Sequence, residues 1–210
     1  MSEDYHLGEL RIAQDPRHPS HILPPPVCPG TRVLDVGCGA GQTLAVAYPD
    51  LESFGLDVDF NALALGRRIA PKVRFTAGRA EQLPFGDAQF DLVIARVSLA
   101  YTNVPESLGE IYRVLKPGGR LWITLNFFSI PWASARQSNW KGKVFFAYIV
   151  LNSLALHFLG KVASFFGRYE SFQTERGITR VLKRSGFTKI AIERGRHFVV
   201  TASSPLQPMS

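Results

Sequence analysis

The sequence predicts a single α/β domain over residues 1–210, built on a mainly parallel sheet with helices on both faces. Three observations support this prediction. Apolar runs of strand length alternate with helical patterns along most of the chain. A glycine-rich turn follows the first apolar run, as it does at the first turn of doubly wound sheets. The last two apolar runs are joined tightly at Gly195, which requires an antiparallel pair.

The expected elements follow from these patterns in chain order. Residues 1–30 are expected to form an N-terminal cap segment, and its proline-rich end at 22–30 cannot be a helix interior. Asp59 is a suitable N-cap for one helix, and Pro105 suits the first turn of another. We expect strands at 32–36, 53–58, 72–77, 90–97, 118–125, 187–194 and 196–203, and helices at 41–48, 59–69, 104–115 and 174–186.

The net charge of +7 is unevenly distributed along a chain of otherwise ordinary globular composition. Residues before Ile130 include 12 Lys and Arg against 14 Asp and Glu, whereas those from Ile130 onward include 12 against 3. A basic C-terminal part suits a membrane surface, an anionic substrate or nucleic acid, and equally a solvated basic face. Nucleic acid is disfavoured because the basic residues are interspersed with apolar ones and form no recognised binding module.

The cysteines and the N-terminus indicate a reducing compartment. Cys28 and Cys38 lack CxxC spacing and a nearby histidine cluster, so neither a disulfide framework nor a metal site is expected. The first ten residues begin acidic and contain no apolar core, unlike a signal peptide. The sequence therefore predicts a cytoplasmic protein.

Two features at adjacent strand ends predict a site for a nucleoside-containing ligand. Gly37, Gly39 and Gly41 follow the first strand, where missing side chains let a ligand approach the backbone. Asp57 ends the second strand about 20 residues past the first glycine, the spacing at which an acid meets ribose hydroxyls. The alternative is that the glycines only make a turn and Asp57 only caps a helix.

The residues around the turn narrow the class of ligand. A dinucleotide fingerprint needs a third glycine in the pattern GxGxxG, and Gln42 stands at that position. Asp35 would repel a pyrophosphate, but it suits a ligand that carries an ammonium and a sulfonium group. This combination points to S-adenosylmethionine (SAM).

Four segments together resemble the class I SAM-dependent methyltransferases, in the small-molecule group that includes the ubiquinone/menaquinone C-methyltransferases. They read VLDVGCGAGQ, GLDVDFNAL, GRAEQLPFGDAQFDLVIAR and EIYRVLKPGGRLWIT, and they cover about residues 31–124. The resemblance implies a Rossmann-like, seven-stranded sheet ordered 3-2-1-4-5-7-6, with strand 7 antiparallel. It also implies methyl transfer by in-line displacement to a small acceptor, and it says little about which acceptor that is.

The resemblance also assigns candidate cofactor-binding residues. Asp57 would hold the ribose hydroxyls, and Val58 would pack on the adenine. Arg79 stands where the family often has an acid facing the adenine amino group, so the Ala80 backbone and Glu81 are the remaining candidates for that edge. The full set is Asp35, Gly37, Cys38, Gly39, Gly41, Asp57, Val58, Arg79, Ala80, Glu81 and Arg96.

No residue pattern identifies a catalytic base, and methyl transfer needs one only when the accepting atom carries a proton. Arg96 would face the transferred methyl group, or it would brace a loop. Tyr101 stands where the family often has a histidine near the acceptor; it could position the acceptor or simply pack under the cap. His21 is a third candidate, with a satisfied loop histidine as the alternative.

Residues 143–166 form an apolar helical pattern inside an expected insertion at 130–170. A narrow polar stripe and a wide apolar face suit a lid over a lipophilic acceptor, a membrane interface or a homodimer contact, and a core helix is the alternative. A membrane crossing is disfavoured, because the last two strands must return to the same sheet. We expect a lid that also suits peripheral membrane contact.

Two other functions compete with methyl transfer. One is a catalytically inactive SAM-fold scaffold that acts at a membrane surface or a partner interface, which Arg79 and the lack of an evident base favour. The other is a nicotinamide-dependent oxidoreductase, which Gln42 disfavours.

Overall fold

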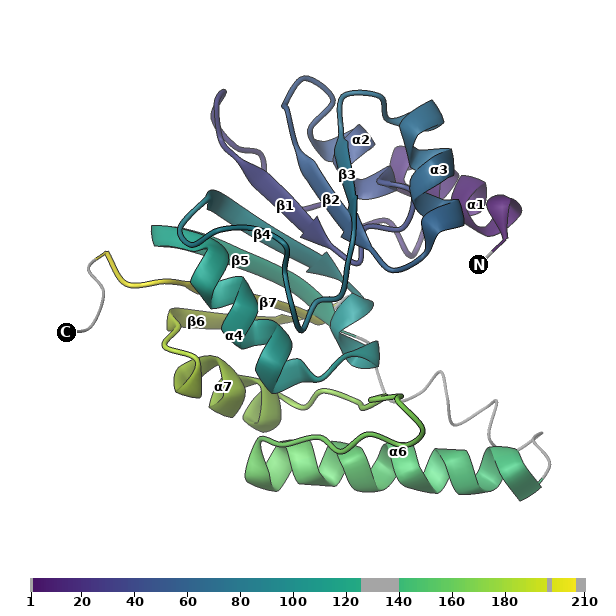
Figure 1. Cartoon of the computed structure of the whole chain (residues 1–210), viewed down its shortest axis with the longest axis vertical. Helices are drawn as coiled ribbons and strands as arrows, with labels where there is room; N and C mark the ends of the chain where they lie inside the picture. The colour runs from purple at the N-terminus through teal and green to yellow at the C-terminus, as the bar shows by residue number, and fades with distance from the viewer. Residues whose placement is uncertain (1, 126–139, 196–197, 207–210) are drawn as a thin grey trace.

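The computed structural model describes residues 2–125, 140–195 and 198–206. Its centre is a seven-stranded sheet with the strand order β3-β2-β1-β4-β5-β7-β6 (Figure 1). All pairs are parallel except those of β7, which runs antiparallel to both β5 and β6. The strands are β1 (Val33–Val36), β2 (Phe54–Asp57), β3 (Arg74–Ala77), β4 (Phe90–Arg96), β5 (Leu115–Leu125), β6 (Thr188–Arg194) and β7 (Phe198–Ser203). The predicted fold class and strand order are confirmed.

The helices agree with the sequence pattern in the middle of the chain and differ from it near the N-terminus. The expected N-cap at Asp59 is confirmed, because its carboxylate accepts from the Asn61 and Ala62 amides. A helix at the N-terminus was not expected. The helices are α1 (Glu3–Gln14), α2 (Gln42–Ala47), α3 (Phe60–Ile69), the 3-10 turn η1 (Ser98–Tyr101), α4 (Val104–Val114), α6 (Trp140–Leu159) and α7 (Glu175–Arg184).

Two apolar clusters form the core, one on each face of the sheet. The larger lies between the sheet and helices α4 and α7, where Leu108, Ile111 and Leu182 are fully buried. The smaller joins the other face to α2 and includes Leu44 and Trp122. Helices therefore cover both faces and leave the carboxyl ends of the parallel strands open for a site.

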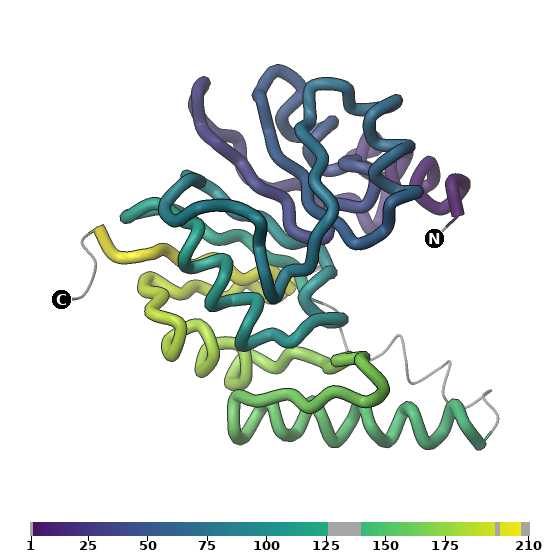
Figure 2. Tube along the Cα trace, in the orientation of Figure 1, coloured from purple at the N-terminus to yellow at the C-terminus, as the bar shows by residue number. Residues whose placement is uncertain are grey.

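Helix α6 is shorter than the predicted helical stretch at 143–166. It ends at Leu159 because Gly160 adopts a left-handed conformation with φ +64°. Residues 160–174 then run back beside α6 toward α7 (Figure 2). Figure 1 shows α6 beside α7, at the opposite end of the molecule from α2 and α3. Residues 130–139 of the expected insertion lie outside the described residues.

Candidate functional site

The glycine loop between β1 and α2 is held by the backbone of β2. The amides of Gly37 and Cys38 both donate to the Leu56 carbonyl oxygen, at 2.7 and 3.0 Å. Gly37 has φ +77°, and a Cβ atom there would lie 2.2 Å from the Cβ of Ser98. A side chain at this position is therefore excluded both by conformation and by space. The loop forms the floor of the predicted cofactor site.

Asp35 supplies a buried acceptor at the end of β1. Its side chain is 1% exposed, and among the described residues no group donates a hydrogen bond to Oδ1. Burial raises the pKa of Asp35 to about 7, with the nearby Arg96 opposing that rise and Asp57 adding to it. A buried carboxylate oxygen without a donor is costly, and a cationic ligand would compensate that cost.

Asp57 connects the glycine loop to the end of β2. Its Oδ2 accepts from the Gly39 amide at 2.7 Å, and its Oδ1 accepts from the Asp59 amide at 2.9 Å. Each carboxylate oxygen has a second lone pair, so two further hydroxyl donors can bind. Asp57 thus fixes the loop and keeps capacity for a ribose diol.

Helix α1 lies over this loop and is held there by buried polar contacts. The His6 ring would lie 3.2 Å from a Cβ atom built on Gly39. The Gln42 amide nitrogen lies 3.0 Å from His6 Nδ1 and donates to the His6 carbonyl at 3.1 Å. Nδ1 then acts as an acceptor, which leaves the ring proton on Nε2, a buried atom without a partner among the described residues. His6 therefore offers a second unsatisfied polar atom beside the loop.

A second contact between α1 and the sheet is an ion pair. Arg96, the last residue of β4, pairs with Glu9, and the two side chains are only 18% and 21% exposed. The pair ties α1 to the carboxyl end of β4 beside the site, and the Glu9 carboxylate offsets the positive charge of the Arg96 guanidinium.

Comparison with known proteins agrees with this geometry. Residues 34–123 match the family model described as a methyltransferase domain. A demethylmenaquinone methyltransferase of Renibacterium salmoninarum is 44% identical over 96 residues, which is 44% of this chain and 40% of that protein. The chain spans less than half the length of this relative. A demethylmenaquinone methyltransferase of Thermus thermophilus is 34% identical over 173 residues, which is 75% of this chain and 74% of that protein.

This chain belongs to the class I SAM-dependent methyltransferases. A solved SAM-dependent methyltransferase from Methanosarcina mazei shares the fold, with a TM-score of 0.60 at 21% identity over 86% of this chain and 95% of that chain. A Haemonchus contortus phosphoethanolamine N-methyltransferase, solved with SAM, has a TM-score of 0.61 at 19% identity over 86% of this chain and 50% of that chain. At these identities the two structures support the fold alone.

The loop after β3 departs from the family pattern at Arg79, and its Arg79 and Glu81 side chains pair with each other. The Glu81 carboxylate accepts from the Asn103 amide at 2.9 Å and lies 3.4 Å from the Arg79 guanidinium. Ala80 between them is buried. The departure at Arg79 thus has a structural partner, and Glu81 braces the start of α4. An adenine contact by this loop stays a prediction.

The remaining predicted residues are divided between the site and its surroundings. Val58 follows Asp57 and is 63% exposed, as an apolar platform for a base would be. Tyr101 ends η1 after β4 and is 61% exposed. Cys38 is buried, and its Sγ would lie 2.8 Å from a Cβ atom on Gly55, so its side chain packs on β2. His21 Nδ1 lies 3.1 Å from the Ile12 carbonyl, near the end of α1 farther from His6.

Sequence reasoning missed His6 and Glu9, the two α1 residues that reach the loop and β4. One signal for the helix was present, because Ser2 caps it by accepting from the Tyr5 amide and two acids follow in the first turn. The contacts themselves had no local signal. Gln42 is 36 positions from His6, and Arg96 is 87 positions from Glu9.

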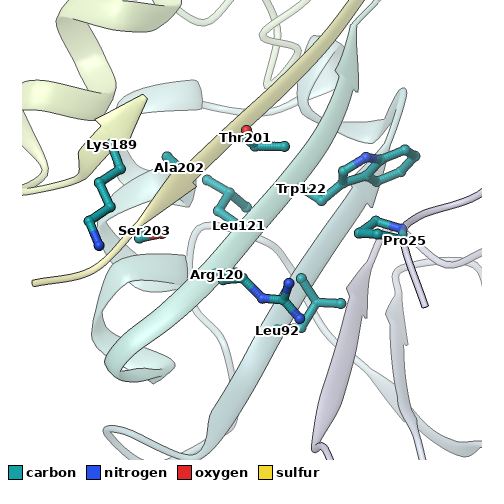
Figure 3. A pocket seen from close by; sticks show the side chains of 9 residues that line it. All are labelled: Pro25, Leu92, Arg120, Leu121, Trp122, Lys189, Thr201, Ala202 and Ser203. Atoms are coloured by element: carbon teal, nitrogen blue, oxygen red, sulfur yellow. The ribbon is translucent and has the colours of Figure 1, made fainter. Parts of the chain in front are cut away.

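A separate cavity of about 210 Å³ lies on the sheet, away from the glycine loop (Figure 3). Pro25 and Trp122 line one end, and Lys189 and Ser203 line the other. Its lining residues in the parallel strands, Leu92 of β4 and Arg120 to Trp122 of β5, stand before the carboxyl ends at Arg96 and Leu125, so it does not open at those ends. Ligand sites in such sheets lie at those ends, and we therefore assign the cavity no part in the site.

Proposed function

We propose that the protein transfers a methyl group from SAM to a small, lipophilic acceptor. The observation that carries this proposal is the buried Asp35 carboxylate beside the side-chain-free loop, with an oxygen that no described group satisfies. Asp35 would hold the ammonium end of SAM, and Asp57 would hold the ribose hydroxyls. Val58 and the Ala80 backbone are proposed for the adenine.

The chain's own residues would bind, orient and dehydrate the reactants. When bound, SAM supplies a methyl group on a sulfonium, which an acceptor can attack without a strong nucleophile from the protein. Alignment can then provide most of the rate acceleration. Helix α1 would exclude water through His6 and through the pair of Glu9 with Arg96. We propose Tyr101 as the residue that positions the acceptor. Arg96 would face the transferred methyl group while it stays paired with Glu9.

For the acceptor we propose a reduced quinone-type ring, a quinol, with an apolar tail: its electron-rich ring carbon forms the new bond to the methyl group as the sulfur–methyl bond breaks, and the ring proton is lost to water. Two of the relatives are named as demethylmenaquinone methyltransferases, and this name is the support for the ring. The alternative, a catalytically inactive scaffold, is not favoured, because the loop, Asp35 and Asp57 are all in place. A nicotinamide cofactor is disfavoured because Gln42 fills the third glycine position and binds His6. The cytoplasmic location stays a prediction.

A transfer assay tests the proposal. The full chain is incubated with radiolabelled methyl-SAM and demethylmenaquinone that dithionite has reduced to the quinol, in detergent, and label in the organic phase is counted. We expect label to appear with the parent protein and to fall by about tenfold or more in Asp35→Ala. Tight binding of S-adenosylhomocysteine without transfer to demethylmenaquinol or to shorter-tailed quinols would contradict the proposal and favour the scaffold.

A further inference from the structure

Helix α6 presents a continuous apolar stripe to solvent. Six side chains recur at alternating intervals of four and three residues, which places them on one face of the helix. These exposed residues are Trp140, Val144, Ala147, Leu151, Leu154 and Phe158. Twenty helical residues extend about 30 Å, so the stripe is long as well as apolar.

Three uncharged polar side chains of α6, Tyr148, Asn152 and Ser153, point the other way, into the protein. Asn152 is buried, and its Oδ1 accepts from the Ala163 amide at 2.7 Å. The Tyr148 hydroxyl donates to the Ala163 carbonyl at 2.9 Å, and the Ser153 hydroxyl accepts from the Phe172 amide at 2.8 Å. A helix on the surface of a soluble protein turns its apolar face inward. Helix α6 buries Leu156 on its inner side but leaves the apolar stripe exposed, and its hydrogen bonds fix this orientation.

The charge that is left unpaired around this stripe is positive. Residues 140–169 contain no Asp or Glu, and Arg168 pairs with the buried Glu170, which leaves the exposed Lys141, Lys143 and Lys161. We propose that α6 lies in the interface of an anionic phospholipid membrane, with the stripe among the acyl chains and the lysines at the headgroups. A second copy of the chain that met this one stripe to stripe would fit poorly, because it would bring three more exposed lysines and no exposed carboxylate from residues 140–169 to pair them.

The helix lies on the membrane and does not cross it. Among the described residues, α6 is the one helix long and apolar enough to span a bilayer. Its inner side packs on α7, where a Cβ atom on Gly177 would lie 3.1 Å from the Leu156 carbonyl oxygen. Because α7, β6 and β7 then return to the sheet, both ends of α6 stay on one side of the bilayer.

The docked helix connects to the acceptor side of the site. The Ser171 amide, in the segment after α6, donates to the Ala100 carbonyl at 3.0 Å, next to Tyr101. Docking through α6 would hold this loop close to the membrane surface that contains a lipophilic acceptor. The membrane proposal itself concerns binding and does not depend on the methyltransferase activity.

Vesicle sedimentation tests the inference. The full chain is mixed with phosphatidylcholine vesicles that contain either no anionic lipid or about 30% phosphatidylglycerol, at low salt and at about 0.5 M salt. We expect the parent to pellet with the anionic vesicles, and less at high salt. The double variant Leu151→Glu/Phe158→Glu should bind at least about tenfold more weakly. Leu206→Glu, the same change at an exposed residue outside α6, should bind like the parent.

Two results would overturn the proposal. One is equal pelleting of the parent and the double variant, or pelleting of neither, with circular dichroism showing both folded. The other is a lipid-free dimer, seen by analytical ultracentrifugation, that the double variant converts to a monomer while the parent fails to bind vesicles. That result would assign the stripe to a second copy of the chain.

Discussion

At the scale of single residues, Asp35 links stability, pH and ligand binding. Its folded pKa of about 7 lies above the ordinary value of 3.8, so the folded chain retains a proton that the unfolded chain has lost. The stability that this protonated group contributes to the folded state is therefore fully present below about pH 4, and it is lost as the pH rises toward 7. Ligand binding should follow the opposite trend, because a cationic ligand prefers the ionised carboxylate.

The variant Asp35→Asn separates these two effects. Between pH 5 and pH 8 the parent should lose roughly 2–3 kcal/mol more unfolding free energy than the variant. The variant should also bind S-adenosylhomocysteine about tenfold more weakly at pH 8. Urea unfolding at both pH values measures the first effect. An identical pH dependence in the two proteins would show that Asp35 is not a buried, proton-retaining group.

Gly37 provides a second test at this scale. In Gly37→Ala the new methyl group would meet Ser98 and would require a left-handed backbone, so we expect destabilisation by about 1–3 kcal/mol. The matched control is Gly109→Ala in α4, where a Cβ atom meets nothing within 4 Å. That change should stabilise the protein by about 0.5–1 kcal/mol. Urea midpoints that shift in the same direction for both variants would contradict the role given to Gly37.

At the scale of elements, α1 is the cover of the site and its ion pair with β4 holds it there. Glu9→Gln keeps an acceptor but removes the charge that faces the mostly buried Arg96, so α1 should lose about 1–2 kcal/mol of local stability. Hydrogen exchange of the α1 amides measures this loss. The control is Glu3→Gln on the same helix, whose pair with Arg68 is exposed and should matter little. Equal exchange in both variants would mean that α1 is held by other contacts.

The difference between predictable and unpredictable elements has a physical basis. The strands and the glycine loop have local signals, namely apolar runs, turn residues and an acid at a fixed spacing. The placement of α1 depends on pairs such as His6 with Gln42, which are far apart in the chain. For α6 the composition was readable, but the inward turn of Asn152 depends on the return segment that it binds. The end of α6 could be predicted from Gly160, but the helical stretch expected from the sequence continued too far, to residue 166.

At the scale of the whole molecule, the fold separates two surfaces. The carboxyl ends of β1, β2 and β4 present the loop, Asp35 and Asp57 beneath α1. The outer face of α6 presents apolar and basic side chains at the other end of the molecule (Figure 1). Among the described residues, the basic side chains after Ile130 lie on α6 and the segment that follows it, on α7 and on β6, so the net charge alone did not indicate a ligand at the glycine loop.

Calorimetric titration tests most directly whether the loop and the two carboxylates bind the adenosyl and amino acid parts that SAM shares with its demethylated product. S-adenosylhomocysteine, the demethylated product, is titrated into the full chain and into Asp57→Ala. NAD is titrated into the full chain in parallel. We predict about micromolar binding of the product by the parent, no heat with NAD, and loss of binding in Asp57→Ala with its fold intact. Binding of NAD in place of the product, or undiminished binding by Asp57→Ala, would contradict the assignment of this site.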